Sequence, residues 1–150
     1  MKKNSEIKKN CLLLLEDGSI FFGIGYGNRG NYLGELCFNT SITGYQEILT
    51  DPSYFNQIIT FTFPHIGIVG TNKYDHESSK MFASGCIINN RITKASNFRS
   101  EIDFEDWLKK NKKACITGVD TRALTKKIRE TGSLNGLIHF PEKKFENLNN

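Results

Sequence analysis

The residues that most often bind metals or carry out catalysis are few and widely separated in this sequence. The 150 residues include three histidines and four cysteines. The histidines are His65, His76 and His139, and the cysteines are Cys11, Cys37, Cys86 and Cys115. No two of them stand at the spacing of a zinc site or of a redox dithiol. The sequence therefore predicts no metal site, and each cysteine, set in a short apolar run, is expected to be a small buried residue of a strand.

Two motifs resemble known chemical sites but stand in the wrong context. Residues 25–30 fit the pattern G-x-G-x-x-G, which binds a pyrophosphate where a strand leads into a helix. A strand pattern follows here instead, so a flexible glycine-rich turn is favoured. Ser84-Gly85-Cys86 comes nearest to a nucleophile elbow, but the isoleucines after it indicate a strand. Neither motif predicts nucleotide binding or nucleophilic catalysis.

The segments richest in unusual polar and aromatic residues are 39–54 and 63–72. Such residues fit poorly in an apolar core, so between strands they are expected to form long ordered loops. Loops of this kind on a rigid scaffold commonly bind a ligand or a partner. The residues alone thus indicate a binding or interface surface and leave its partner open.

Strands must position most of this surface, because the periodicity of the chain is mostly that of strands. Asp17-Gly18 between two apolar runs predicts an opening hairpin. Strands are expected at residues 11–16, 19–24, 33–39, 57–63, 85–88, 114–117 and 136–140.

Three short segments have helical patterns. The first is expected to begin at Thr43 with a capping box that Gln46 completes, and to end at Asp51-Pro52. The second, at residues 103–110, places three apolar residues on one face. The third begins at Asp120 as N-cap and ends at Gly132.

The formal net charge of +4 does not by itself indicate a nucleic-acid partner. The first ten residues account for +3 of it, which favours a solvated basic tail over an arm that binds nucleic acid. No apolar run approaches the roughly 18 residues of a membrane span, and none has the form of a secretory signal. We therefore expect a cytoplasmic protein with no nucleic-acid or membrane partner.

The two polar segments, together with residues 95–99 and 120–125, closely resemble the small chain of glutamine-dependent carbamoyl phosphate synthetase. The resemblance covers the N-terminal domain of that chain, from about Leu12 to Gly136. Its most specific part is the run N-T-S-x-T-G-Y-Q-E-I-L-T-D-P-S-Y, which begins at Asn39.

The resemblance implies an α/β fold of the three-layer β/β/α swivelling type. It also implies a role in making carbamoyl phosphate from glutamine, bicarbonate and ATP, for pyrimidine and arginine synthesis. Ser53 is the implied contact to glutamine, and no other catalytic, cofactor or metal residue is implied in this chain. The implied partners are the large chain, which holds ATP and magnesium, and the glutamine amidotransferase domain of the small chain.

The family's amidotransferase domain and its nucleophilic cysteine have no counterpart in this sequence. We therefore expect the 150 residues alone not to hydrolyse glutamine.

Residues 1–10 are expected to form a disordered basic tail, 11–140 the domain, and 141–150 a linker-like tail. Residues 43–54 and 64–72 are expected to form the interface with the partners, and exposure of this surface in the isolated domain is expected to favour association or aggregation. A free-standing binding module that has lost the reaction is the alternative function.

Overall fold

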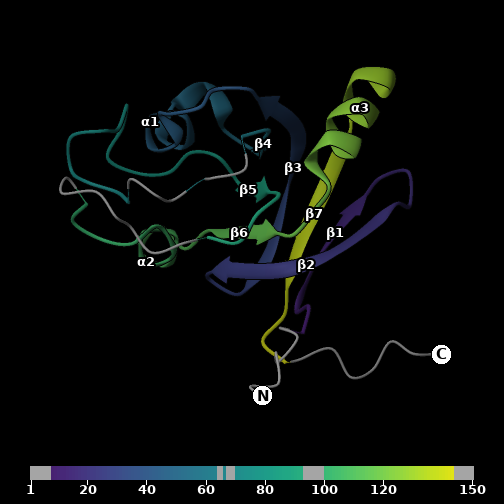
Figure 1. Ribbon diagram of the computed structural model, residues 1–150, viewed down its shortest axis with the longest axis horizontal. Helices are drawn as coiled ribbons and strands as arrows, with labels where there is room; N and C mark the ends of the chain where they lie inside the picture. Colours follow the sequence, from purple (N-terminus) through teal and green to yellow (C-terminus); the bar gives the residue numbers. More distant parts are fainter. Residues whose placement is uncertain (1–7, 64–65, 67–69, 93–99, 144–150) are drawn as a thin grey trace, which may run out of the picture.

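The computed structural model describes residues 8–63, 66, 70–92 and 100–143. Within them, seven strands close into a barrel in the order β1-β2-β6-β5-β4-β3-β7 (Figure 1). The strands are β1 (Cys11–Leu15), β2 (Ile20–Gly27), β3 (Gly30–Asn39), β4 (Gln57–Phe61), β5 (Gly85–Ile88), β6 (Ala114–Thr117) and β7 (Asn135–Phe140). The helices are α1 (Tyr45–Thr50), the short 3-10 helix η1 (Pro52–Tyr54), α2 (Phe104–Lys110) and α3 (Thr121–Thr131).

The barrel has an antiparallel half and a parallel half. The strands β2, β1, β7 and β3 pair antiparallel in that order, whereas β3, β4, β5 and β6 pair parallel. Antiparallel pairing of β2 with β6 closes the barrel. The expected α/β class is confirmed, and the closed barrel is the form that the sheet takes.

Alternate residues of the parallel strands face two different apolar clusters. Ile58, Ile87 and Ile116 belong to an inner cluster inside the barrel, which also contains buried residues of α3. Ile59 and Cys86 belong to an outer cluster, which α1 and α2 cover. Figure 1 shows these two helices on one side of β4–β6 and the antiparallel strands on the other. Nearly continuous burial of β4, β5 and β6 explains why their sequences are mostly apolar, with Gln57, Thr60 and Thr117 as the polar exceptions.

Most predicted elements are confirmed, with shifted ends. β5 and β6 have the predicted bounds, and the hairpin of β1 and β2 forms around Asp17-Gly18. β2 continues to Gly27 and β3 begins at Gly30, so the predicted glycine-rich turn is reduced to the two residues between them. The cause is pairing of Ile24 to Gly27 with β6, which local sequence does not reveal. β4 ends at Phe61, two residues before the predicted end.

The expected capping box at Thr43 is wrong. The N-cap of α1 is Gly44, in the left-handed conformation with φ of 81°, and no side chain caps this end. The Gln46 side chain bonds instead to the backbone of Asn72. The predicted end of this helix is confirmed, because Asp51 is its C-cap. The predicted N-cap of α3 is also confirmed, since the Asp120 side chain accepts a hydrogen bond from Ala123 N.

The expected tails lie mostly outside the described residues. Asn10 is attached to the barrel, because its N–H donates to Gly23 O at 3.0 Å. At the other end, Pro141 O accepts a hydrogen bond from Arg29 Nη1 at 2.5 Å. Among the described residues, no helix has the length and apolar composition needed to cross a bilayer.

Candidate functional site

Ser53, the residue implied to contact glutamine, lies exposed in η1 between α1 and β4. The Asp51 carboxylate accepts a hydrogen bond from Ser53 N at 2.9 Å and so caps η1, while Pro52 occupies the first helical position. Proline there loses no hydrogen bond, and its fixed φ favours a helical start. Asp51, and not Ser53, is therefore the capping side chain of this turn. Within the described residues, no hydrogen bond of the Ser53 hydroxyl is found.

The turn that carries Ser53 is fixed at its far end by β3. Asn56 has a positive φ of 60°, and its carbonyl accepts a hydrogen bond from Glu35 N at 3.2 Å. Phe55 is 63% exposed, and the edge of its ring meets Phe82. The exposed residues Ser53 and Phe55 thus stand two positions apart on a short turn that is fixed at both ends.

Behind this turn, α1 is joined to the second polar segment by paired hydrogen bonds. Gln46 Nε2 donates to Asn72 O at 2.6 Å, and Asn72 N donates to Gln46 Oε1 at 3.0 Å. The Tyr45 hydroxyl donates to Gly70 O, and burial raises the pKa of that hydroxyl. Gln46 and Asn72 are 5% and 8% exposed. The expectation that these polar residues form an exposed interface is therefore wrong for them, because their hydrogen bonds are satisfied internally.

The Asn72 side chain organises the residues that follow it. Its Oδ1 accepts hydrogen bonds from Tyr74 N and Asp75 N, and its Nδ2 donates to the Asp75 carboxylate at 2.6 Å. Further along, Glu77 N donates to Thr50 Oγ1 at 2.9 Å. These contacts hold residues 72–77 against α1, so this segment has a defined path along the helix.

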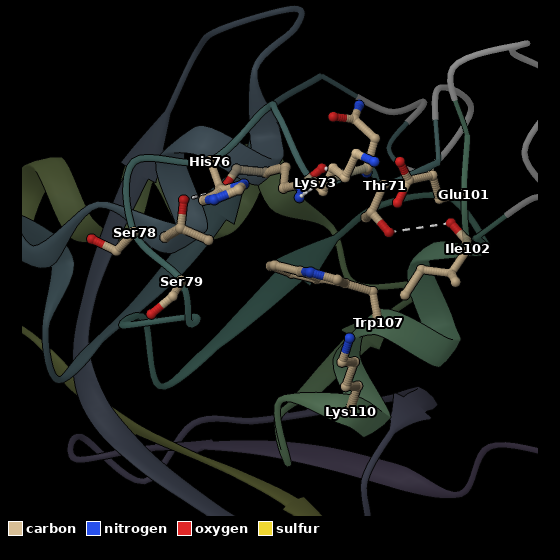
Figure 2. Close-up of a pocket in the computed structure, with 12 residues that line it drawn as sticks. Thr71, Lys73, His76, Ser78, Ser79, Glu101, Ile102, Trp107 and Lys110 are labelled. Atoms are coloured by element: carbon tan, nitrogen blue, oxygen red, sulfur yellow. Dashed lines mark hydrogen bonds between the residues drawn. The ribbon is translucent and has the colours of Figure 1, made fainter.

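A cavity of about 270 Å³ lies between α1, residues 71–79, residues 101–102 and the second half of α2. Figure 2 shows the Trp107 side chain extending across it, with Thr71 and Ile102 on one side and Ser78 and Ser79 on the other. Thr71 Oγ1 donates to Ile102 O at 3.2 Å, which joins the two segments on that side. The volume suits a small polar molecule or a few waters.

The charged residues around this cavity are of both signs. Lys73 and Lys110 line it together with Glu101, and His76 lies at its rim. Within the described residues, no group of three or more His, Cys, Asp or Glu side chains is arranged to hold a metal ion. The arrangement can bind a polar group through several hydrogen bonds, but it does not present a nucleophile paired with a base.

Three of the four cysteines are poor nucleophiles in this structure. Burial raises the pKa of the Cys11 thiol to about 12 and that of Cys37 to about 11. Burial also raises the pKa of Cys115, whose thiol lies beside that of Cys86 on the neighbouring strand. Because their pKa values are raised, the thiols of Cys11, Cys37 and Cys115 are protonated near pH 7, and the thiolate is the reactive form. The prediction of small buried strand residues is confirmed for Cys11, Cys86 and Cys115, whereas Cys37 in β3 is only partly buried.

The structure separates the predicted site residue from the cavity. Ser53 does not line the cavity, although both adjoin α1. Residues 64–65, 67–69 and 95–99, which also belong to the predicted motifs, lie outside the described residues. Sequence reasoning missed the cavity because its walls come from three separate segments. Trp107 is one of the three apolar residues predicted on one face of the helix at residues 103–110, and its burial agrees with that prediction.

The sequence matches the family described as carbamoyl-phosphate synthase small chain, CPSase domain, over residues 13–138. The small chain of Ruegeria pomeroyi carbamoyl phosphate synthase is 47% identical over 147 residues, covering 97% of this chain and 38% of the relative. The small chain of Salmonella typhimurium is 53% identical over 130 residues, covering 87% of this chain and 34% of the relative. That of Escherichia coli K12 is 52% identical, with the same two coverages.

The matched region therefore spans about a third of the length of these curated relatives. The family match includes β2 to β6 in full, most of β1 and β7, and the turn that carries Ser53. A match over this much of the chain, at this identity, establishes the relationship. The chain belongs to the carbamoyl-phosphate synthase small chain family, within the CPSase domain of that family.

Proposed function

We propose that this chain serves as the non-catalytic N-terminal domain of the small chain of a glutamine-hydrolysing carbamoyl phosphate synthase. In this role it supports the glutamine site and the contact with the large chain. The assembled enzyme would make carbamoyl phosphate from glutamine, bicarbonate and ATP in the cytoplasm, for pyrimidine and arginine synthesis. The observation that carries the proposal is Ser53, whose hydroxyl is exposed on a braced turn in a motif specific to the family.

Ser53 is the residue proposed to contact glutamine. Glutamine carries an α-carboxylate, an α-amino group and a side-chain amide, and a serine hydroxyl can bond any of them because it both donates and accepts. The Asp51 cap and the hydrogen bond between Glu35 and Asn56 fix the turn on both sides of Ser53. A fixed turn loses little conformational entropy when its hydroxyl binds a ligand.

The hydrolysis itself is proposed to take place on the amidotransferase domain. Burial and raised pKa values of Cys11, Cys37 and Cys115 support this division, because these thiols are protonated near pH 7. ATP and magnesium are proposed to bind the large chain.

We propose that residues 11–140 form one domain of the three-layer β/β/α swivelling type. The packing of the parallel strands between the antiparallel strands and α1 and α2 supports that description.

A hybrid small chain tests the proposal. Residues 13–138 replace the matched region of the Salmonella typhimurium small chain, and the hybrid is assembled with the large chain of the same enzyme. We expect glutamine-dependent synthesis of carbamoyl phosphate by the assembly. The 150 residues alone should show no glutaminase activity, and such activity would contradict the proposed division of labour.

Substitution of Ser53 in this hybrid tests the contact with glutamine. Ser53→Trp should raise the KM for glutamine at least tenfold, because the ring fills the space that the substrate needs, and Ser53→Ala should raise it less. Synthesis from ammonia should be unchanged, since ammonia does not need the glutamine site. Ser133→Trp, at an exposed turn far along the chain, is the matched control. Equal KM values for glutamine in Ser53→Trp and in this control would show that Ser53 does not contact glutamine.

A pull-down of the 150 residues against the large chain distinguishes this function from the alternative. Assembly, and activity only in the complete assembly, would support a component of the enzyme. Failure of the hybrid and of the pull-down together would favour a free-standing binding module of the same ancestry.

A further inference from the structure

A groove of about 430 Å³ lies between α3 and the residues that follow β3 and β4. One wall is formed by Thr40 and Thr62, which come directly after the two strands, and the other by one side of α3. Ser53 does not line this groove, and the groove shares no lining residue with the cavity around Trp107. Its volume is in the range of small-molecule sites. The groove is therefore a separate place where a ligand can bind.

The strand wall of the groove continues the inner face of the barrel. Ile58 packs in the inner cluster, whereas its neighbour Ile59 packs in the outer cluster. Because side chains alternate along a strand, Thr60 and Thr62 lie on the same face as Ile58. Thr62 N donates to Asn39 O at 3.1 Å, so pairing with β3 continues to this residue. The groove is thus the polar mouth of the barrel, at the end where the parallel strands β3 and β4 stop.

Two buried threonine hydroxyls in this region lack a hydrogen-bond partner. Thr121, the first residue of α3, lines the groove and is 4% exposed. Its carbonyl accepts a hydrogen bond from Thr125, but within the described part of the chain its hydroxyl makes none. Thr60 lies one step deeper on the strand wall, is fully buried, and its Oγ1 has no partner either. Buried hydroxyls are nearly always bonded, so Thr121 indicates a partner that comes from outside the described residues.

The helix wall of the groove is cationic. Arg122, Lys126 and Arg129 line it, and Glu130 is the one acidic residue among the described lining residues. Three cations and one carboxylate leave a formal charge of +2 on this wall. Lys126 Nζ lies 3.9 Å from the Glu130 carboxylate and both side chains are mostly exposed, so this pair is weak. The charge of the groove favours an anion.

Arg129 is positioned by an aromatic ring. Its guanidinium lies over the Phe38 ring, 5.0 Å from the centroid, and Phe38 is paired with Thr60 on the neighbouring strand. A guanidinium can donate two parallel hydrogen bonds to a phosphate, and one that is stacked on a ring loses less freedom when it does so. The N-terminus of α3 is not needed for binding, because Asp120 already caps it.

We propose that this groove binds the phosphate monoester of a small polar metabolite. The cationic side chains of α3 hold the phosphate, which carries close to two negative charges at neutral pH. Threonine hydroxyls, that of Thr121 among them, bond the phosphate oxygens or the hydroxyl groups of the ligand. The described lining residues include no aromatic or large aliphatic side chain, so the rest of the ligand is polar. The inference goes beyond the proposed function and does not depend on Ser53.

A nuclear magnetic resonance titration of the 150-residue chain with glycerol 3-phosphate tests the site. The amide signals of residues 121–130 should shift, with a Kd of about 1 mM or lower. Arg129→Met keeps an unbranched side chain against Phe38 but removes the charge, so it should raise the Kd at least tenfold. Arg91→Met, at an exposed position outside the groove, is the matched control and should leave the Kd unchanged. Absence of binding, or equal Kd values for the two variants, would overturn the proposal.

Thr121→Val separates a contact with the ligand from a role in the fold. Loss of the hydroxyl should raise the Kd several-fold, whereas the thermal midpoint should stay the same or rise, because no described partner is lost. Thr131→Val is the matched control, since its hydroxyl donates to Lys127 O at the far end of α3, outside the groove. An unchanged Kd in Thr121→Val would overturn the proposal, because this hydroxyl distinguishes the groove from an ordinary charged surface.

Two further probes identify the chemical group that binds. Inorganic phosphate should bind at least fivefold more weakly than glycerol 3-phosphate, because it lacks the polar body that the threonines contact. Glycerate, which carries a carboxylate in place of the phosphate, should also bind more weakly, since it has less charge. Equal binding of inorganic phosphate would overturn the metabolite in favour of free phosphate. Tighter binding of glycerate would overturn the phosphate in favour of a carboxylate.

The hybrid small chain distinguishes a metabolite from a protein segment as the occupant. Saturation transfer to glycerol 3-phosphate is measured with and without the large chain, with Arg129→Met as the blank. The signal that depends on Arg129 should be present in both states. Its loss when the large chain is added would overturn the proposal in favour of an acidic segment of that chain. A hybrid that never uses glutamine but binds glycerol 3-phosphate would refute the proposed function and leave this site standing.

Discussion

At the residue scale, buried polar side chains decide the shape of the region around α1. The Gln46 amide pairs with both backbone groups of Asn72, and the Asn72 amide in turn bonds the backbone of residues 74 and 75. Buried backbone groups that lose such partners cost about 1–3 kcal/mol each. These side chains thus specify one arrangement of a segment that has little regular secondary structure.

Replacing Gln46 by Leu should destabilise the chain by about 2–3 kcal/mol, because it leaves Asn72 N–H and C=O buried without these partners. The free energy of unfolding in urea is the measurement. Gln57→Leu, at the half-buried first position of β4, is the matched control and should change stability by less than about 0.5 kcal/mol. Similar losses for both variants would show that the paired bonds contribute little.

An ion pair between the first hairpin and α3 predicts a dependence of stability on pH. The hydrogen bond from Lys127 lowers the pKa of Asp17 from 3.8 to about 2. A carboxyl group with a lowered pKa stabilises the fold above its unfolded pKa, and this stabilisation is lost as the pH falls through the folded value. The contribution of Asp17 should therefore be complete at pH 6 and disappear between about pH 4 and pH 2.

Lys127→Met tests this pair. The urea midpoint of the variant should lie below that of the parent chain at pH 6, and the two midpoints should converge as the pH falls toward 2. Lys126→Met is the control, because its partner Glu130 is 3.9 Å away and both side chains are mostly exposed. A difference between Lys127→Met and the parent that does not change with pH would assign the effect to packing.

At the element scale, two helix ends differ in how their first N–H groups are satisfied. α3 begins with Asp120, whose carboxylate accepts from Ala123 N at 3.0 Å. α1 begins with Gly44 in the left-handed conformation, and the Thr43 side chain makes no cap. α1 has only six residues, so its contacts with residues 70–77 and with β4 and β5 through the outer cluster stabilise it more than its own ends do.

Asp120→Ala should cost about 1 kcal/mol, the usual effect of removing an N-cap side chain. Thr43→Ala should change stability by less than about 0.5 kcal/mol. Helix content by circular dichroism and the free energy of unfolding measure both variants. A loss near 1 kcal/mol for Thr43→Ala would show that the capping box forms in solution.

At the scale of the whole molecule, closure of the barrel depends on close approach between strands. A Cβ built on Gly23 would lie 2.2 Å from the backbone oxygen of Thr117 in β6, and one on Gly25 would lie 2.7 Å from the Phe140 ring. β2 and β6 are the strands that close the antiparallel half onto the parallel half. A side chain at residue 23 cannot be accommodated unless these backbones separate.

Gly23→Ala should therefore destabilise the barrel by about 3 kcal/mol, at the upper end of the usual cost of overpacking. Gly18→Ala is the comparison, because no atom lies within 4 Å of its added Cβ and only its φ of 86° opposes the change. That variant should cost about 1 kcal/mol. Guanidinium unfolding of the two variants gives the difference, and equal costs would contradict a close approach of β2 and β6.

Local signals determined those elements whose ends depend on a few neighbouring residues. Asp17-Gly18 predicted the hairpin, Asp120 and Gly132 predicted both ends of α3, and short apolar runs gave β5 and β6. Each signal acts through turn geometry, capping or burial within a few residues, so it can be identified without knowledge of the fold. The motif around Ser53 likewise indicated a binding surface, and its resemblance to a family indicated which family.

The tertiary structure alone decided the features that depend on residues far apart in the sequence. β7 pairs between β1 and β3, and pairing of β2 with β6 closes the barrel and extends β2 through Gly25 and Gly27. Gln46 is buried because Asn72, 26 residues away, pairs with it. Such contacts depend on which surfaces meet after folding, and the local pattern of polar and apolar residues does not specify that.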